Sequence, residues 1–432
     1  MERKIVNELI AWKDNKNRKP LLLYGARQVG KTYTALMFGK QQYKNTVYFS
    51  LEDSQEIQAV FRQDLDPARI VRELSVLSGQ SIFKGDTLII LDEIQACERA
   101  LHALKNFCEN APEYHILAAG SLLGVAINRQ QASFPVGKVD MLTMMPLDFE
   151  EYLWALGKQA LADMIRACCK DFTPLSLHET ALEAYKNYLV IGGMPEVVGK
   201  FKESGDYDFV RATQKNLNNA YIADMAKYAG PQETTRIMAA WASIPAQLAK
   251  ENRKFQYKVI KSGARAYDYE IPIQWLRSAG IVHQCILAKE GKMPLAAYSD
   301  NHSFKIYMFD TGLLCSKFDI AAQVILSGTH TMDGFKGALA ENYIMQALAA
   351  NGIVPYYWAS EGEAELDFVF QSKQGEIIPL EVKSADNVRS KSLKRYMDLY
   401  QPPYAIRVSA KNFGFENNIR SVPLYAVYCI ER

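Results

Sequence analysis

The chain has 432 residues, which at roughly 150 residues per domain predicts two or three domains. Its 50 basic and 48 acidic residues leave a formal charge of +2, which gives no global argument for nucleic acid or a membrane surface as a partner. Seven scattered cysteines without metal-ligand spacing argue against a disulfide framework or a zinc site. No apolar run approaches the ~18 residues of a membrane span and no secretory segment is evident, so we expect a cytoplasmic protein without a membrane partner.

Short apolar runs alternate with helical patterns over residues 1–195. The runs are Leu21–Tyr24, Val47–Phe49, Thr87–Leu91 and Ile116–Ala119. Because continuous apolar strands between helices are typical of a parallel sheet covered on both faces, this pattern predicts an α/β domain. The segment Gly192-Gly-Met-Pro195 cannot continue a helix, and it indicates a domain boundary at residue 195.

A phosphate-binding motif, G-x-x-x-x-G-K-[ST], directly follows the first apolar run. Glycines at both ends allow the backbone N–H groups to curl around an anion, and the helix from Thr32 to Lys40 points its positive end at the same place. Lys31 is expected to reach the β- and γ-phosphates of ATP, and the Thr32 hydroxyl is expected to bind Mg²⁺. The predicted nucleotide-binding residues are Gly25, Ala26, Arg27, Gln28, Val29, Gly30, Lys31 and Thr32.

Two carboxylates end the third apolar run, which we expect to neighbour the strand before the phosphate loop. Asp92 is placed to hold Mg²⁺ through water, and Glu93 is placed to polarise the attacking water as a general base. Glu93 and Lys31 are therefore the predicted catalytic residues. Two solvated acids at a strand exit are the alternative interpretation.

The fourth run ends in Gly120 and Ser121. Ser121 could contact the γ-phosphate beside the attacking water, although a simple loop serine explains it nearly as well. An arginine finger cannot be identified, because Arg129 is one of many arginines at a plausible distance.

The middle of the chain, residues 196–300, is mostly helical. Apolar positions from Ile271 to Val282 predict a helix and then a short strand after Gly280. This order is typical of a winged helix-turn-helix module, and a plain helical linker domain explains it equally well.

Residues 301–432 form a second predicted α/β unit. Phe304–Phe309 alternates like a strand and Gly337–Leu348 is helical. Further strand-like runs follow at 355–358, 365–370, 377–382 and 404–408.

Four polar residues of this last unit could meet at one site. Glu341 lies in the predicted helix, Asp367 on one strand, and Glu381 and Lys383 on the next, where residues two apart share a face. The pattern resembles the metal-dependent PD-(D/E)xK nucleases and a restriction-endonuclease-like fold, in which the carboxylates would bind Mg²⁺ and the lysine would orient water. A nuclease-derived binding fold and a salt-bridged surface pattern are the alternatives.

The order of motifs along the chain resembles the AAA-type ATP-binding proteins of bacteria and archaea, and within them a subgroup with a C-terminal domain of unknown function. This resemblance implies ATP binding, hydrolysis and an AAA-like fold. Relatives carry Gly-Arg where this chain has Gly137-Lys138, and lysine lacks the forked donors of arginine. The resemblance rests on residues 25–32, 91–95, 119–121, 145–153, 192–195, 221–225, 307–313 and 380–383.

The sequence therefore favours a Mg²⁺-dependent ATPase whose nucleotide state is coupled to C-terminal modules. DNA, another protein and further copies of the chain all remain open as partners. A nucleotide-regulated DNA nuclease and a non-hydrolysing ATP-dependent scaffold are the rival hypotheses.

Overall fold

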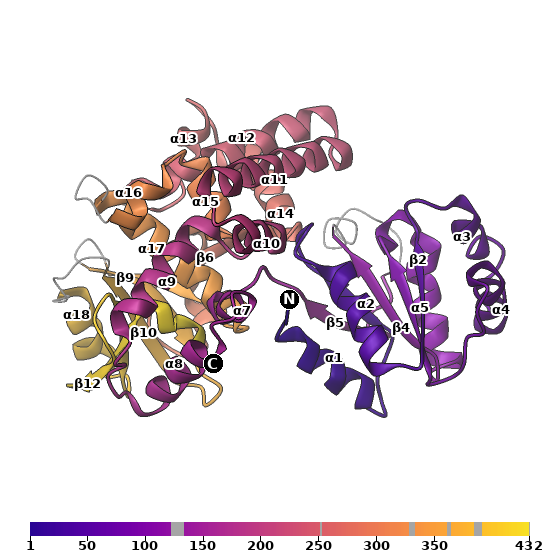
Figure 1. The fold of residues 1–432 in the computed structure, drawn as a ribbon. Coiled ribbons are helices and arrows are strands. Elements are labelled where there is room, and N and C mark those ends of the chain that lie inside the picture. Colours follow the sequence, from indigo (N-terminus) through magenta and orange to yellow (C-terminus); the bar gives the residue numbers. More distant parts are fainter. Residues whose placement is uncertain (122–133, 251–252, 328–332, 361–363, 384–390, 432) are drawn as a thin grey trace. The chain divides into compact units, whose positions relative to one another are not determined.

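The computed structural model describes residues 1–121, 134–250, 253–327, 333–360, 364–383 and 391–431. Its chain divides into two compact units (Figure 1). The N-terminal unit holds Glu2–Met145 with Ser278–Gly280, and the C-terminal unit holds Met1, Pro146–Arg277 and Ile281–Arg432. The predicted boundary at residue 195 is thus not where the compact units divide.

The N-terminal unit is built around one parallel sheet. Its described strands follow the order β2-β3-β4-β1-β5, and helices flank them on both sides (Figure 1). The elements are α1 (Ile5–Asp14), β1 (Leu21–Tyr24), α2 (Lys31–Gln42), β2 (Asn45–Ser50), α3 (Gln55–Val60), α4 (Pro67–Ser78), β3 (Thr87–Asp92), α5 (Glu98–Asn110), β4 (His115–Gly120) and β5 (Asp140–Thr143).

Burial on both faces explains why the central strands of this sheet are continuously apolar. Leu22 and Ile89 pack into a core with Leu104 of α5. Side chains alternate along a strand, so Leu21 and Ile90 face the other side, where α2 packs against β3 and β4. The α/β class and the four predicted strands are therefore confirmed.

The position of β4 corrects one expectation about this sheet. β1 and β3 were expected to be neighbours, but β4 lies between them and pairs in parallel with each. All residues of β4 are buried, as an interior strand requires, whereas alternate residues of β5 are exposed at the sheet edge. Ser121, directly after β4, therefore lies at the same carboxyl end of the parallel strands as the phosphate loop and Asp92.

The C-terminal unit combines helices with a mixed sheet. Its described strands follow the order β12-β13-β11-β10-β9-β8-β6-β7. Its helices are α7 (Phe149–Ala155), α8 (Gln159–Asp171), α9 (His178–Ile191), α10 (Pro195–Ser204), α11 (Tyr207–Tyr228), α12 (Pro231–Leu248), α13 (Tyr257–Ile260), α14 (Ala266–Ser278), α15 (Thr311–Lys317), α16 (Ala322–Ser327), α17 (Asp333–Ala350) and α18 (Lys391–Tyr400). Its strands are β6 (Val282–Ala288), β7 (Ser299–Met308), β8 (Tyr356–Ala359), β9 (Glu365–Gln371), β10 (Ile377–Lys383), β11 (Ala405–Ser409), β12 (Gly414–Glu416) and β13 (Ile419–Pro423).

This sheet takes strands from both sides of the predicted boundary between residues 300 and 301. β6 and β7 pair antiparallel, and β6 also pairs in parallel with β8. The predicted boundary therefore falls inside β7. Strand pairing between distant segments overrides the local change of pattern from which that boundary was inferred.

The segment Gly192–Pro195 lies in the interior of the C-terminal unit. Gly193 donates its N–H to Asp310 Oδ2 (2.6 Å), and its carbonyl accepts from the N–H of Leu147 (2.7 Å). A Cβ on Gly193 would lie 2.0 Å from the Leu147 carbonyl oxygen. The glycine pair is therefore required by close packing, which sequence reasoning read as a chain break.

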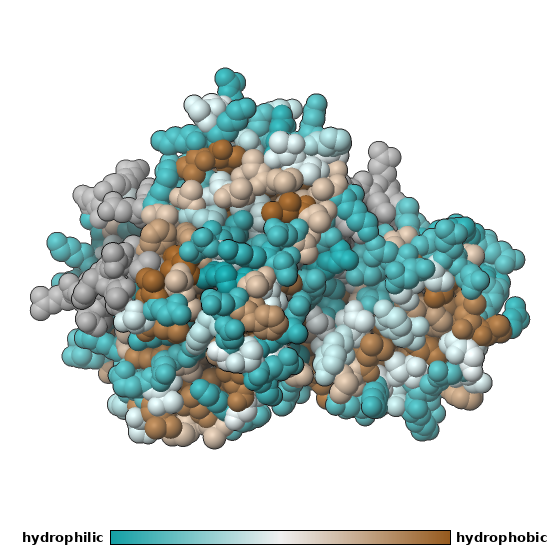
Figure 2. Space-filling view, turned by 45° about the horizontal axis from the view of Figure 1, so that its top comes forward, coloured by the Kyte–Doolittle hydropathy of each residue, from teal (hydrophilic) through white to brown (hydrophobic). Residues whose placement is uncertain are grey.

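Hydrophilic residues dominate the face shown in Figure 2, where apolar residues stand in separate groups. Over the described part of the chain, no helix combines the length and the apolar character that crossing a bilayer needs.

Candidate functional site

The phosphate loop between β1 and α2 has a backbone that requires glycine at both ends. Gly25 has φ +147°, and a Cβ there would lie 2.2 Å from the carbonyl oxygen of Met144. Gly30 precedes α2 with φ +96°, in the left-handed region that side chains disfavour. Gln28, which is not glycine, also has a positive φ of 65°. The loop is thus held in a turn that its sequence permits and its surroundings enforce.

Arg3 supports this loop from the N-terminal end of the same unit. Its Nη1 donates to the carbonyl of Val29 (2.9 Å), and its Nη2 donates to the carbonyl of Met145 (2.5 Å). The arginine is only 7% exposed. Sequence reasoning missed Arg3, because no local pattern links it to a loop so far along the chain.

Lys31 lies at the start of α2 with its ammonium turned over the loop. Its Nζ donates to the carbonyls of Gly25 (3.0 Å) and Ala26 (2.8 Å). Burial lowers the pKa of Lys31 to about 8, against the opposing effect of Glu93 and Asp92. The ammonium is therefore poorly solvated and gains much from a phosphate anion.

This shift predicts how ATP affinity depends on pH. Bound phosphates would raise the pKa of Lys31 above about 8, so the bound state holds its proton to higher pH than the free state. We expect affinity to be nearly constant below pH 8 and to fall by up to about tenfold per pH unit above it. Calorimetry at pH 7, 8 and 9, in buffers of different ionisation enthalpy, measures both the affinity and the proton uptake.

The control for this pH dependence is Lys31→Arg, which stays charged through the window and should lose the dependence. The terminal phosphate of ATP titrates at about pH 6, below this pH range, and does not interfere. An affinity that stays constant from pH 7 to 9 without proton uptake would contradict the role of Lys31.

Thr32 and Asp92 meet although they follow different strands. The Thr32 hydroxyl donates to Asp92 Oδ2 at 2.6 Å, and the Tyr48 hydroxyl of β2 donates to the same oxygen at 3.1 Å. Hydroxyl and carboxylate oxygens suit Mg²⁺, which usually takes one or two protein ligands beside phosphates and water. The donor set therefore fits a nucleotide-bound Mg²⁺, and Tyr48 is a further residue there that sequence reasoning missed.

Glu93 is held in a strained conformation beside Ser121. Its φ of 49° and ψ of 46° lie in the left-handed region, and its N–H donates to Asp92 Oδ1 (3.0 Å). Ser121 Oγ (3.3 Å) and the Gln95 amide both donate to Glu93 Oε2. The structure thus brings the predicted general base and the predicted γ-phosphate contact together, and Gln95 contacts the same carboxylate.

The other residues considered around this site have different surroundings. Ala26 and Val29 are 3% and 0% exposed and support the loop, whereas Arg27 is half-buried and contributes to lowering the pKa of Lys31. Lys138 pairs with Glu109 at the surface (2.9 Å). Arg129 lies outside the described residues.

The C-terminal unit brings the four residues of the predicted nuclease-like set to adjoining elements. Leu380 of β10 pairs with Phe368 of the antiparallel strand β9, so Glu381 and Asp367 are at the next cross-strand position. The Val382 N–H donates to Asp367 Oδ2 at 2.8 Å. Burial is the main cause that raises the pKa of Asp367, and the nearby carboxylates of Glu341 (α17) and Glu381 raise it further.

Basic side chains engage most of these acids. Arg253 forms an ion pair with Glu341, which also accepts from the Tyr307 hydroxyl (3.1 Å). Lys383 pairs with Glu381 at 2.6 Å. Lys305, which is 1% exposed, pairs with Glu365 at 2.7 Å. Burial alone would lower the pKa of Lys305, but the carboxylates of Glu341, Glu365 and Asp367 outweigh it and raise the pKa.

The C-terminal acids are thus partnered by the protein's own donors, and as arranged they do not fit a divalent cation. Within the described ranges, no group of three or more His, Cys, Asp or Glu side chains is arranged to hold a metal ion. Arg253 and Lys305 come from elements outside the nuclease-like pattern. Sequence reasoning could not have found them, because nothing in the spacing links them to Asp367.

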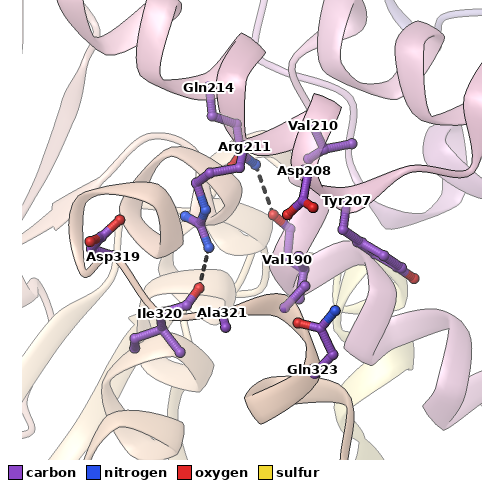
Figure 3. Close-up of a pocket in the computed structure, with 11 residues that line it drawn as sticks. Val190, Tyr207, Asp208, Val210, Arg211, Gln214, Asp319, Ile320, Ala321 and Gln323 are labelled. Carbon is purple, nitrogen blue, oxygen red and sulfur yellow. Dashed lines mark hydrogen bonds between the residues drawn. The ribbon is translucent and has the colours of Figure 1, made fainter.

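A pocket of about 200 Å³ lies among the helices of the C-terminal unit (Figure 3). Arg211 donates to the carbonyl of Ile320, and Gln214 donates to the carbonyl of Val190 (2.8 Å). The polar side chains of the lining therefore tie α11 to its neighbours. None of the predicted site residues is among its lining residues.

Comparison with protein families divides the chain into three segments. Residues 17–153 match a family model described as an AAA domain. Residues 182–324 and 336–427 match two families described as domains of unknown function, DUF8612 and DUF4143. Among curated proteins the chain has no match.

Similar solved structures come from archaea and bacteria. The Walker-type ATPase PABY2304 of Pyrococcus abyssi is 13% identical, with 74% of this chain and 95% of that chain covered and a TM-score of 0.45. The ORC2 protein of Aeropyrum pernix, described as ADPNP–ADP complexes, is 13% identical, with 80% and 92% covered and a TM-score of 0.37. The RuvB Holliday junction branch migration motor of Thermotoga maritima is 15% identical, with 66% and 89% covered and a TM-score of 0.31.

The family match and the site geometry define residues 17–153 as an AAA-type P-loop domain, a class that binds ATP. The segments that follow match families to which no function is assigned.

Proposed function

We propose that this protein is a Mg²⁺-dependent ATPase whose nucleotide state is coupled to its C-terminal unit. The observation that carries the proposal is the 2.6 Å contact between Thr32 Oγ1 and Asp92 Oδ2. It unites the end of the phosphate loop with an acid-tipped strand two places away in the sheet, which is the pairing that a Mg²⁺–ATP site needs.

Each residue then has a distinct role. Backbone N–H groups of residues 25–32 and the ammonium of Lys31 would bind the phosphates. Thr32 and Asp92 would hold Mg²⁺, which when bound neutralises the developing charge on the phosphates. Glu93 would accept the proton of the attacking water. Ser121, whose hydroxyl donates to Glu93, would contact the γ-phosphate beside that water.

Two measurements on the purified chain test this proposal and separate it from the scaffold hypothesis. Calorimetry with ATP and Mg²⁺ measures binding, and phosphate release measures turnover. Binding with turnover supports the ATPase. Tight binding without turnover would favour a non-hydrolysing switch, and no binding of any nucleoside triphosphate would end the proposal.

The C-terminal unit is proposed to engage DNA or a partner protein. In support, α14 is followed by the antiparallel pair β6–β7, an order typical of a winged helix-turn-helix module. Sedimentation of the same samples with and without ATP shows whether copies of the chain assemble when the nucleotide is present.

The nuclease-like set is proposed to belong to a nuclease-derived fold that does not cut DNA. The convergence of Glu341, Asp367 and Glu381 supports the derivation, and their basic partners argue against a catalytic metal. We expect no cleavage of plasmid DNA with Mg²⁺ or Mn²⁺, measured on agarose gels over hours. Cleavage that disappears in Asp367→Ala would contradict this and establish the rival hypothesis of an active nuclease. Cleavage that persists in this variant would indicate a contaminant.

A further inference from the structure

Helix α14 carries an exposed face with large side chains on it. Tyr267 is 89% exposed and Ile271 is 63% exposed, and Gln274 continues the same face three residues on. The opposite face is buried, with Ile273 and Leu276 at 4% and 1% exposure. Tyr267 and Ile271 are four residues apart, so they are neighbours on the exposed side of the helix and give this face an apolar element.

Positive charges gather at the N-terminal side of this face. Lys258 of α13 and Lys261 and Arg265 of the turn before α14 are all exposed. In the part of the chain that the structure describes, no acidic side chain pairs with any of the three. The acids of α14 are Asp268, which pairs with Arg236 (3.6 Å), and the exposed Glu270. The local balance is therefore basic, although the whole chain is nearly neutral.

We propose that this surface, formed by Lys258, Lys261, Arg265, Tyr267, Ile271 and Gln274, binds duplex DNA. A helix fits a major groove about 12 Å wide, and cations beside its N-terminal end fall next to the phosphate backbone. Gln274 supplies an amide that can pair with adenine, and Ile271 supplies an apolar contact for a thymine methyl group. This inference deepens the proposed function by choosing DNA as the partner of the C-terminal unit.

The charge pattern argues for DNA in preference to an acidic protein. Exposed cations flank the face at both ends, with Lys258, Lys261 and Arg265 on the segment that leads into the helix and Arg277 in its last turn. The centre of the face carries neutral side chains and one acid, Glu270. Phosphate contacts position a protein, and contacts to base edges discriminate among sequences. A face that binds an acidic protein surface would be expected to carry its cations among the apolar residues.

Fluorescence anisotropy of the full chain with a labelled duplex of about 25 base pairs tests the proposal without nucleotide. We expect the triple variant Lys258→Ala, Lys261→Ala, Arg265→Ala to bind at least about tenfold more weakly at low salt. The slope of log affinity against log salt should become smaller by about 0.9 for each phosphate that the variant no longer neutralises. Ile271→Ala with Gln274→Ala should keep this slope and lose discrimination among duplexes of different sequence.

The matched control is Lys158→Ala, Lys170→Ala, Lys202→Ala, which removes three exposed lysines elsewhere in the C-terminal unit. Unchanged DNA binding in the first triple variant, equal loss in the control, or equally tight binding of poly-glutamate would each overturn the proposal. ATP turnover without DNA is measured in parallel. A chain that binds DNA through α14 without hydrolysing ATP would contradict the proposed ATPase, while a chain that hydrolyses ATP without binding DNA would contradict only this inference.

Discussion

We expect replacement of Lys31 by alanine or of Glu93 by glutamine to reduce ATP turnover by about 10²-fold or more, with each substitution acting at a different step. Lys31→Ala removes the buried ammonium that the phosphates would neutralise, so both affinity and turnover should fall, turnover by about 10²-fold or more. Glu93→Gln keeps the shape and the contact with Ser121 but loses the basic oxygen. We expect ATP binding within about threefold of the unaltered chain and turnover reduced by about 10²–10⁴-fold.

Calorimetry and phosphate release distinguish these two steps. The matched controls are Lys40→Ala, an exposed lysine of the same helix α2, and Glu98→Gln, an exposed acid beyond the end of β3. Both controls should behave like the unaltered chain. If Glu93→Gln turns over ATP at an unchanged rate, Glu93 is not the general base. If Lys31→Ala also leaves the rate unchanged, the site between β1 and β3 is not where ATP is hydrolysed.

Replacing Gly193 by alanine destabilises the C-terminal unit, by about 3 kcal/mol or more. The added Cβ would lie 2.0 Å from the Leu147 carbonyl oxygen, which is a backbone atom that cannot rotate away. Moving Gly193 away from Leu147 would also stretch the hydrogen bond from the Gly193 N–H to the buried carboxylate of Asp310. A buried acceptor left without its donor costs about 1–3 kcal/mol by itself.

Urea unfolding followed by tryptophan fluorescence measures this loss. Four of the five tryptophans lie in the C-terminal unit, so the signal reports mainly on that unit: Trp154, Trp241, Trp275 and Trp358. The control is Gly230→Ala, where φ is −66° and a Cβ would meet nothing within 4 Å, so the midpoint should hardly move. Equal midpoints for the two variants would mean that the packing around Gly193 relaxes freely.

The sequence alone determined the features that depend on neighbouring residues. The phosphate loop could be predicted because its glycines, lysine and threonine act within a single turn between a strand and a helix. The strands before Gly25 and before Asp92 could be predicted for the same reason, since burial on both faces makes a strand apolar throughout. Spacing also indicated that Glu381 and Lys383 share one face of a strand, and the structure pairs them.

Only the tertiary structure decided which distant segments meet. It placed β4 between β1 and β3, brought Tyr48 to Asp92, and joined Gly193 to Asp310 in a region that local sequence marked as a boundary. It also set Arg253 against Glu341, which changes the expected chemistry of the C-terminal acids. The physical reason is common to all of these contacts: periodicity and turn chemistry act over a few residues, whereas strand order and the partners of buried charges are selected by the packing of the whole chain.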